Sequence, residues 1–146
     1  GKLDTDNLKV SVVGSGEADF GSIVCDAINF EVRGSGDLSA KRVDAKTAVA
    51  NVAGSGDLNF DFLKADNAYF AVRGSGDLDA MLSQVKDMQF NVVGSGDMDI
   101  KAQNCGVANC TCAGSGSITL SGTVRDVVKN VTGSGEVSTN NLHFVR

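Results

Sequence analysis

The chain has few of the residues on which catalysis and nucleic-acid binding depend. Its only histidine is His143, which lies near the irregular C-terminal end of the repeats, so we expect no histidine-based catalytic triad or metal cluster. With 13 basic and 18 acidic residues, its net charge is −5, which argues against nucleic acid or an anionic membrane surface as a partner. No apolar run approaches the ~20 residues of a membrane-spanning helix. The sequence therefore predicts neither nucleic-acid binding nor membrane insertion by this segment.

Exposed aromatics and helical patterns are scarce as well. Tyr69 is the one aromatic residue that the pattern clearly places outside, which disfavours a sugar site built on ring stacking. Neither a 3.6-residue periodicity nor a helix-capping pattern is found, so the chain is predicted to be all-β. Glycine, by contrast, is abundant at 18 residues, and most of these belong to one repeated turn.

That turn is the tripeptide Gly-Ser-Gly. Its seven copies begin at Gly14, Gly34, Gly54, Gly74, Gly94, Gly114 and Gly133. The spacing is 20 residues five times and then 19. A fixed period of this size is typical of solenoids, in which each repeat is one structural unit stacked on the next. Because solenoids present long regular surfaces, the repeat favours binding over single-site catalysis.

The repeats align in columns, which we number from the first glycine of each turn as zero. Columns 4 and 6 are apolar, and so are columns 14, 16 and 18, so both stretches alternate with the period of two shown by half-buried strands. Column 6 alternates large and small side chains: Phe20, Ala40, Phe60 and Ala80. Column 11 places an apolar residue between the two strands: Cys25, Ala45, Ala65, Val85 and Cys105.

Two architectures fit this pattern, a parallel β-helix with one coil per repeat and an antiparallel meander joined by hairpins. Gly-Ser-Gly marks only every second turn, whereas a meander needs hairpin residues at both. The charge of column 12 alternates through Asp26, Lys46, Asp66 and Lys86, which is favourable only between neighbours. We therefore predict a right-handed parallel β-helix of about seven coils of ~20 residues. The short last repeat predicts a one-residue deletion within residues 121–129.

Acidic residues gather in columns 3 and 5, which point outward on the strand after each turn. These columns hold Glu17, Asp19, Asp37, Asp57, Asp77, Asp79, Asp97, Asp99 and Glu136. The densest cluster is Asp77, Asp79, Asp97 and Asp99. Stacked carboxylates repel one another, so one hypothesis is a bound cation such as calcium. The other is that column 3 accepts backbone hydrogen bonds in the turn while Arg33 and Arg73 neutralise part of the remaining charge. We favour the second and expect no metal and no cofactor, because the nonapeptide pattern of calcium-binding β-rolls is missing.

All four cysteines fall in inward columns: Cys25, Cys105, Cys110 and Cys112. Free cysteine in a core behaves as a small hydrophobic residue. A three-thiolate zinc site is conceivable but lacks the paired spacing of structural zinc motifs. We expect core filling, with a Cys105–Cys110 disulfide as the alternative.

The Gly-Ser-Gly turns are not expected to bind phosphate, because no helix N-terminus is predicted behind them. Their hydroxyls form a column that we interpret as a hydrogen-bonded turn ladder rather than a set of nucleophiles. Its members are Ser15, Ser35, Ser55, Ser75, Ser95, Ser115 and Ser134.

The block Gly-Ser-Gly-Asp-Leu at residues 34–38, 54–58 and 74–78, with Gly-Ser-Gly-Asp-Met at 94–98, carries a family resemblance. From about Val10 onward the chain resembles the head GIN domain family of auto-transporter adhesins, found in bacterial envelope proteins, notably of Bacteroidetes. The resemblance implies a β-helical module that is secreted or associated with the cell surface or outer membrane, with no known active site. We interpret residues 1–146 as one β-helical domain from a longer secreted precursor.

These observations favour a non-enzymatic, adhesin-like binding module that offers a flat strand face to a protein or glycan at the cell surface. One alternative is a self-assembling scaffold similar to bactofilins, with homo-oligomers formed through the solenoid ends. A polysaccharide-active β-helix enzyme is the least favoured, since short loops and uniform strands leave little room for a catalytic groove. No catalytic or cofactor-binding residue is assigned.

Overall fold

The fold is described by a computed structural model for residues 2–139 and 142–144, in which all regular structure is β-strand. The strands are β1 (Lys2–Gly14), β2 (Glu17–Gly34), β3 (Asp37–Asp44), β4 (Thr47–Gly54), β5 (Asp57–Lys64), β6 (Asn67–Gly74), β7 (Asp77–Ser83), β8 (Asp87–Gly94), β9 (Asp97–Gly114), β10 (Ser117–Thr132), β11 (Glu136–Ser138) and β12 (Leu142–Phe144). The prediction of an all-β chain is confirmed.

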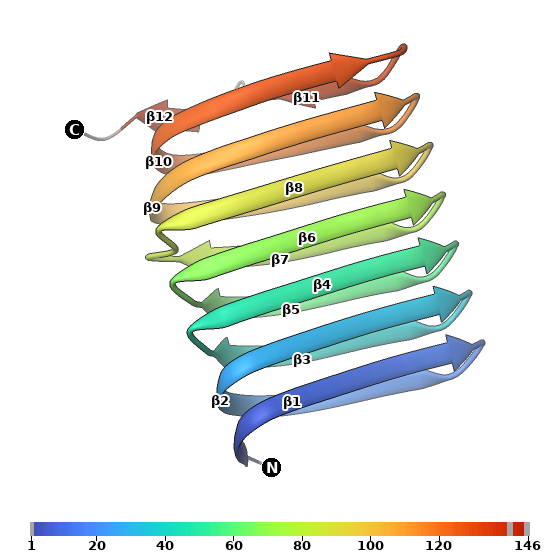
Figure 1. The fold of residues 1–146 in the computed structure, drawn as a ribbon, viewed down its shortest axis with the longest axis vertical. Coiled ribbons are helices and arrows are strands. Elements are labelled where there is room, and N and C mark those ends of the chain that lie inside the picture. The colour runs from blue at the N-terminus through green and yellow to red at the C-terminus, as the bar shows by residue number, and fades with distance from the viewer. Residues whose placement is uncertain (1, 140–141, 145–146) are drawn as a thin grey trace.

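Successive repeats form stacked coils, each with one strand on either side (Figure 1). The paired strands are parallel, and residues 20 apart face each other, as Asp37 faces Asp57 and Ala48 faces Ala68. Strands β3, β5 and β7 lie on one face and β4, β6 and β8 on the other, while β2, β9 and β10 bend round and contribute to both. The parallel coil is therefore confirmed over the antiparallel meander.

The winding is right-handed. In Figure 1 the chain rises from the N-terminus, the near strands run to the right, and the far strands run back to the left. This is the hand expected of parallel connections, because right-twisted strands return to the same sheet that way.

At the Gly-Ser-Gly turns the backbones of adjacent coils approach too closely for side chains. The first glycine of each turn has a positive φ between 90° and 108°. At the second glycine the obstacle is the coil below: a Cβ on Gly76 would lie 2.4 Å from the carbonyl oxygen of Gly56 and 2.7 Å from Cγ1 of Val52. Only glycine fits both positions without displacement.

Backbone hydrogen bonds hold these turns together. The N–H of Ser75 donates to the carbonyl of Gly54 at 3.0 Å, and the N–H of Asp77 donates to Gly56 at 3.2 Å. The serine side chains of the seven turns are exposed. The predicted turn ladder is thus present, but it runs through backbone amides and not through the hydroxyl groups.

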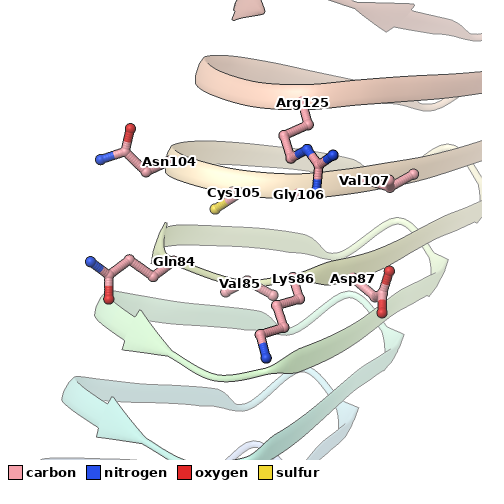
Figure 2. A pocket seen from close by; sticks show the side chains of 9 residues that line it. All are labelled: Gln84, Val85, Lys86, Asp87, Asn104, Cys105, Gly106, Val107 and Arg125. Carbon is pink, nitrogen blue, oxygen red and sulfur yellow. The ribbon is translucent and has the colours of Figure 1, made fainter. Parts of the chain in front are cut away.

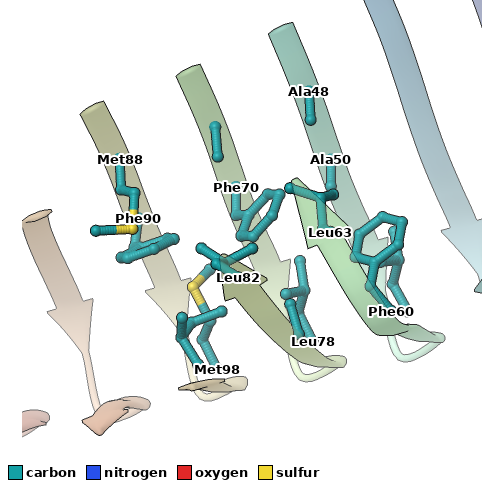
Figure 3. Packing of buried hydrophobic residues seen from close by; sticks show 14 of the residues in the cluster. Ala48, Ala50, Phe60, Leu63, Phe70, Leu78, Leu82, Met88, Phe90 and Met98 are labelled. Atoms are coloured by element: carbon teal, nitrogen blue, oxygen red, sulfur yellow. The ribbon is translucent and has the colours of Figure 1, made fainter. Parts of the chain in front are cut away.

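Inside the coil, the two faces pack through large and small residues that alternate along the axis (Figure 3). Five phenylalanines form a continuous chain across the core, with ring centroids 5.0–6.3 Å apart: Phe20, Phe30, Phe60, Phe70 and Phe90. The coil between Phe30 and Phe60 contributes Ala40 and Ala50, so the rings of its neighbours meet across it. This packing confirms the layering predicted from column 6.

The corner opposite the Gly-Ser-Gly turn, which we call the second corner (columns 10–12), changes form along the chain. In the first three coils the inward residue before it is in column 9, as in Val43 and Leu63, but in the next coil it is Leu82, in column 8. The extra residue is taken up at the corner by Gln84 and then Asn104, whose φ values are 55° and 52°.

The last full coil loses this extra residue. Gly122 still faces Ala102, but Val124 faces Cys105, so the deletion lies at Thr123, within the predicted interval 121–129. The hydroxyl oxygen of Thr123 accepts a hydrogen bond from the N–H of Asn104 at 2.8 Å. A side chain thereby replaces the missing backbone partner.

The turn geometry predicts a position-dependent cost for adding one methyl group. Gly76→Ala should destabilise the fold by about 2–3 kcal/mol, because its Cβ overlaps a backbone carbonyl that cannot move away. Gly16→Ala is the matched control, since nothing lies within 4 Å of its Cβ and its φ is not positive. Chemical denaturation of both variants measures the difference. Equal losses would contradict a cost due to coil-to-coil contact.

Candidate functional site

The outward side chains of β3, β5 and β7, together with those of the first halves of β2 and β9, form a surface that we call the acidic face. Asp37, Asp57, Asp77 and Asp97 occupy adjacent positions in paired strands. Burial, and then the neighbouring charges of Asp37 and Asp77, raise the pKa of the Asp57 carboxyl, against a backbone hydrogen bond from Asp77. The stacked carboxylates therefore make this face costly to keep fully ionised.

In column 5, the second acidic column, Asp79 experiences the same charge repulsion. Its pKa is raised by burial and by the charges of Asp99, Asp77 and Asp57, and Lys101 opposes this shift. Elsewhere on this face hydroxyl groups relieve the repulsion. Ser117 Oγ donates to the Asp97 carboxylate at 2.8 Å, and Ser39 Oγ donates to Asp19.

The four aspartates of the cation hypothesis are brought together as two adjacent pairs, Asp77 with Asp97 and Asp79 with Asp99. Within the described part of the chain, no group of three histidine, cysteine, aspartate or glutamate side chains is arranged to hold a metal ion. The arginines were expected to offset the acidic columns, but Arg33 forms an ion pair with Glu31 on its own strand. This strand segment belongs to the opposite face, because the Gly-Ser-Gly turn lies between the two columns.

The cysteines serve the core, as the sequence predicts. All four are buried, and Cys105 and Cys110 are both free thiols, so the alternative disulfide between them is not formed. Cys105 Sγ lies 3.5 Å from the Gln103 carbonyl oxygen and 3.8 Å from that of Leu82. Burial raises the pKa of Cys105, and it raises that of Cys110 to about 11. Both thiols stay protonated near neutral pH and are poor nucleophiles.

The opposite side of the solenoid, which we call the amide face, has a different chemistry. We define it by the outward residues in columns 15 and 17 of β2, β4, β6, β8 and β9: Asn29, Glu31, Val49, Asn51, Tyr69, Ala71, Gln89, Asn91, Asn109 and Thr111. Glu31 is the one charged residue of this set, and the exposed Arg33 and Arg73 lie next to it in column 19 of the same face. Tyr69 lies in its middle strand, with 37% of its surface exposed. The face is rich in hydrogen-bonding amides and carries few charged side chains.

A cavity of about 500 Å³ opens at the second corner, over the coils that carry the inserted corner residues (Figure 2). Its rim includes Gln84, Asn104 and the two cationic residues Lys86 and Arg125, and Gly106 forms part of its floor. The column pattern of the sequence did not predict this site. The signal that could have found it is the shift of the inward residue from column 9 at Leu63 to column 8 at Leu82.

Two stretches of the chain, residues 1–84 and 82–145, match the family described as "Putative auto-transporter adhesin, head GIN domain". The chain belongs to the head GIN domain family. The predicted resemblance is therefore confirmed. Two consecutive matches in one GIN domain chain agree with the internal repetition of the solenoid. The search of curated proteins and the search of solved structures each found no match.

Membership of the family supports an adhesin-like, surface-associated role for this GIN domain chain. The described residues include no helix that is long and apolar enough to span a membrane. What distinguishes this chain physically is the contrast between its two broad faces and the cavity at its second corner.

Neutralising one aspartate should stabilise the fold on the acidic face and destabilise it at the second corner. Asp57 stands between Asp37 and Asp77, whereas Asp66 stands between Lys46 and Lys86. Removing one repulsive neighbour should raise the melting temperature of Asp57→Asn by about 1–2 °C at neutral pH and low salt. Asp66→Asn should lower it by a similar amount. Thermal melts at two salt concentrations measure both effects, which should shrink as salt screens the charges.

The effect of Asp57→Asn on stability should depend on pH. Because folding raises the pKa of Asp57 above 3.8, the folded state holds this proton more tightly than the unfolded chain. The stabilisation that this tighter proton binding gives the folded state is fully present below the unfolded pKa of Asp57. It is lost as pH rises through the folded pKa, where Asp57 becomes charged. The advantage of Asp57→Asn should therefore grow from about pH 4 upward. An advantage that does not depend on pH would show that repulsion is not its cause.

The cation hypothesis is tested by a thermal melt with calcium and with a chelator. A site formed by Asp77, Asp79, Asp97 and Asp99 would bind the folded state and raise its melting temperature. We expect no specific shift at millimolar calcium, since the described residues contain no metal-binding group of three. A rise that Asp79→Asn abolishes and Asp19→Asn does not would establish the site.

Proposed function

We propose that this chain is a non-enzymatic binding module of a bacterial cell surface, and that its amide face contacts a protein or glycan partner. Membership of the head GIN domain family supports the adhesin-like role but does not indicate which face binds. The observation that carries the choice of face is the series of uncharged side chains in columns 15 and 17 of β4, β6, β8 and β9, beside a face of stacked carboxylates.

The physical argument is the cost of removing water. A charged side chain loses strong hydration when a partner covers it, whereas an amide can exchange water for a partner's hydrogen bonds at much lower cost. On the acidic face a partner would have to cover stacked carboxylates, and burial and neighbouring charges already raise the pKa of Asp57 and Asp79. Columns 15 and 17 of the amide face therefore offer a surface that a partner can cover without burying unpaired charge, since Glu31 is already paired with Arg33. Tyr69 supplies a central aromatic contact of the kind enriched at interfaces.

The regular spacing of the amide face favours an extended partner. Gln89 faces Asn109 and Asn91 faces Thr111 in paired strands, so donors and acceptors repeat at each coil, ~4.8 Å apart. A polymer or an extended peptide can use several of these groups at once. Many weak contacts then add up to stable attachment.

One substitution made on each face tests this proposal. Asn51→Asp adds a charge to the amide face, and Asn59→Asp adds the same charge to the acidic face. The purified chain is applied to an array of glycans and of cell-surface proteins. We expect Asn51→Asp to reduce binding to the partner found there by tenfold or more, as expected for an unpaired charge at an interface. Asn59→Asp should bind as the parent chain does.

Equal losses in the two variants, or no binding on either array, would contradict the proposal. Light scattering over a dilution series addresses the scaffold alternative. A binding module should keep its size on dilution, whereas filaments that grow with concentration would favour a self-assembling scaffold.

A further inference from the structure

The charges at the second corner form an ordered series that is interrupted at one coil. Asp26, Lys46, Asp66 and Lys86 are stacked neighbours: the N–H of Lys46 donates to the Asp26 carbonyl and the N–H of Lys86 to that of Asp66, both at 3.0 Å. Continued alternation requires an acidic residue in the next coil. That position holds Gly106, and the coil above it again carries a cation, Arg125.

Gly106 has no side chain because the backbones are too close at this point. A Cβ there would lie 2.0 Å from the carbonyl oxygen of Lys86, and the N–H of Gly106 donates to the Val85 carbonyl at 2.7 Å. The chain therefore cannot place a carboxylate of its own between the two cations. The result is a gap in the charge series, and this gap is part of the cavity of about 500 Å³.

Of the two cations around the gap, Arg125 is placed over it, and Lys86 reaches it by turning from the preceding coil. Neither Lys86 nor Arg125 forms an ion pair within the described residues. In Figure 2 Arg125 extends over Gly106, Lys86 is directed toward the preceding coil, and the carboxylate of Asp87 is turned away from Gly106. Since coils are ~4.8 Å apart, a carboxylate at the gap lies about one coil from the base of each cation. The flexible stem of an exposed lysine spans this distance.

The rim of the cavity adds neutral hydrogen-bonding groups. Gln84 and Asn104 are exposed amides on the two left-handed corner residues, and they flank the opening from adjacent coils. Amides both donate to and accept from hydroxyl groups. The volume of about 500 Å³ lies within the range of ~300–1,000 Å³ found for small-molecule sites.

We propose that the second corner binds the carboxylate of a hydroxylated sugar acid, such as a uronate residue of an acidic polysaccharide. The carboxylate takes the place of the missing acidic side chain above Gly106, between Lys86 and Arg125. The sugar hydroxyls meet the amides of Gln84 and Asn104. This site is separate from the amide face, so the failure of one proposal leaves the other intact.

The test is an NMR titration of the isotope-labelled chain with sodium glucuronate at low salt, with glucose and acetate as reference ligands. We expect saturable shifts in the amide signals of residues 104–107 with glucuronate, and at least tenfold weaker binding of either reference ligand. Arg125→Gln and Lys86→Gln should each weaken glucuronate binding about tenfold. Lys46→Gln is the matched control, because its acidic neighbours Asp26 and Asp66 are in place.

Each other outcome overturns the proposal in an identifiable way. Equal binding of acetate would show an anion site without sugar recognition. An equal loss in Lys46→Gln and Lys86→Gln would show general electrostatic attraction. Shifts that persist in Arg125→Gln would place the ligand elsewhere. Asn51→Asp should leave glucuronate binding unchanged, which separates this site from the amide face.

Discussion

The structure depends on the close stacking of backbones at the Gly-Ser-Gly turn. Each turn sits directly on the one below, with its amides bonded to carbonyls that a Cβ would displace. This contact sets the position of every coil at one edge. Once the edge is fixed, residues 20 apart are forced into register, and equal columns stack along both faces. The core layers and the carboxylate series both follow from that register.

Much of the fold could be predicted because its information is local and repeated. Column 6 and the two glycines of each turn determine which side of each strand is buried and where the chain reverses. The interval of the deletion could also be predicted, because apolar residues resume one position early after it. These features repeat in nearly every coil. An ambiguous assignment in one repeat can therefore be resolved by comparison with the equivalent residues of the others.

The second corner could not be predicted in the same way, because its departures occur in single coils. The bulge between Phe60 and Leu63 shifts the inward position by one residue, and the left-handed Gln84 and Asn104 restore it. Since the repeat length stays at 20 residues, the spacing of the turns gives no sign of either change. The cavity at Gly106 depends on these compensating shifts. The prediction that Arg33 offsets the acidic columns was likewise wrong, because Arg33 pairs with Glu31 on the other face. A column can be assigned to a face only when it is known on which side of the turn the column lies.

The nearly constant separation of 19 or 20 residues between paired positions has a consequence for how the chain folds. Most β-proteins must close long loops before distant strands can pair, and this slows their folding. Here each new coil closes a loop of the same modest length on a template that is already formed, so the entropic cost per coil does not grow with the number of coils. A chain of this kind can add its coils one at a time from one end, and each coil can form before the last residues are in place.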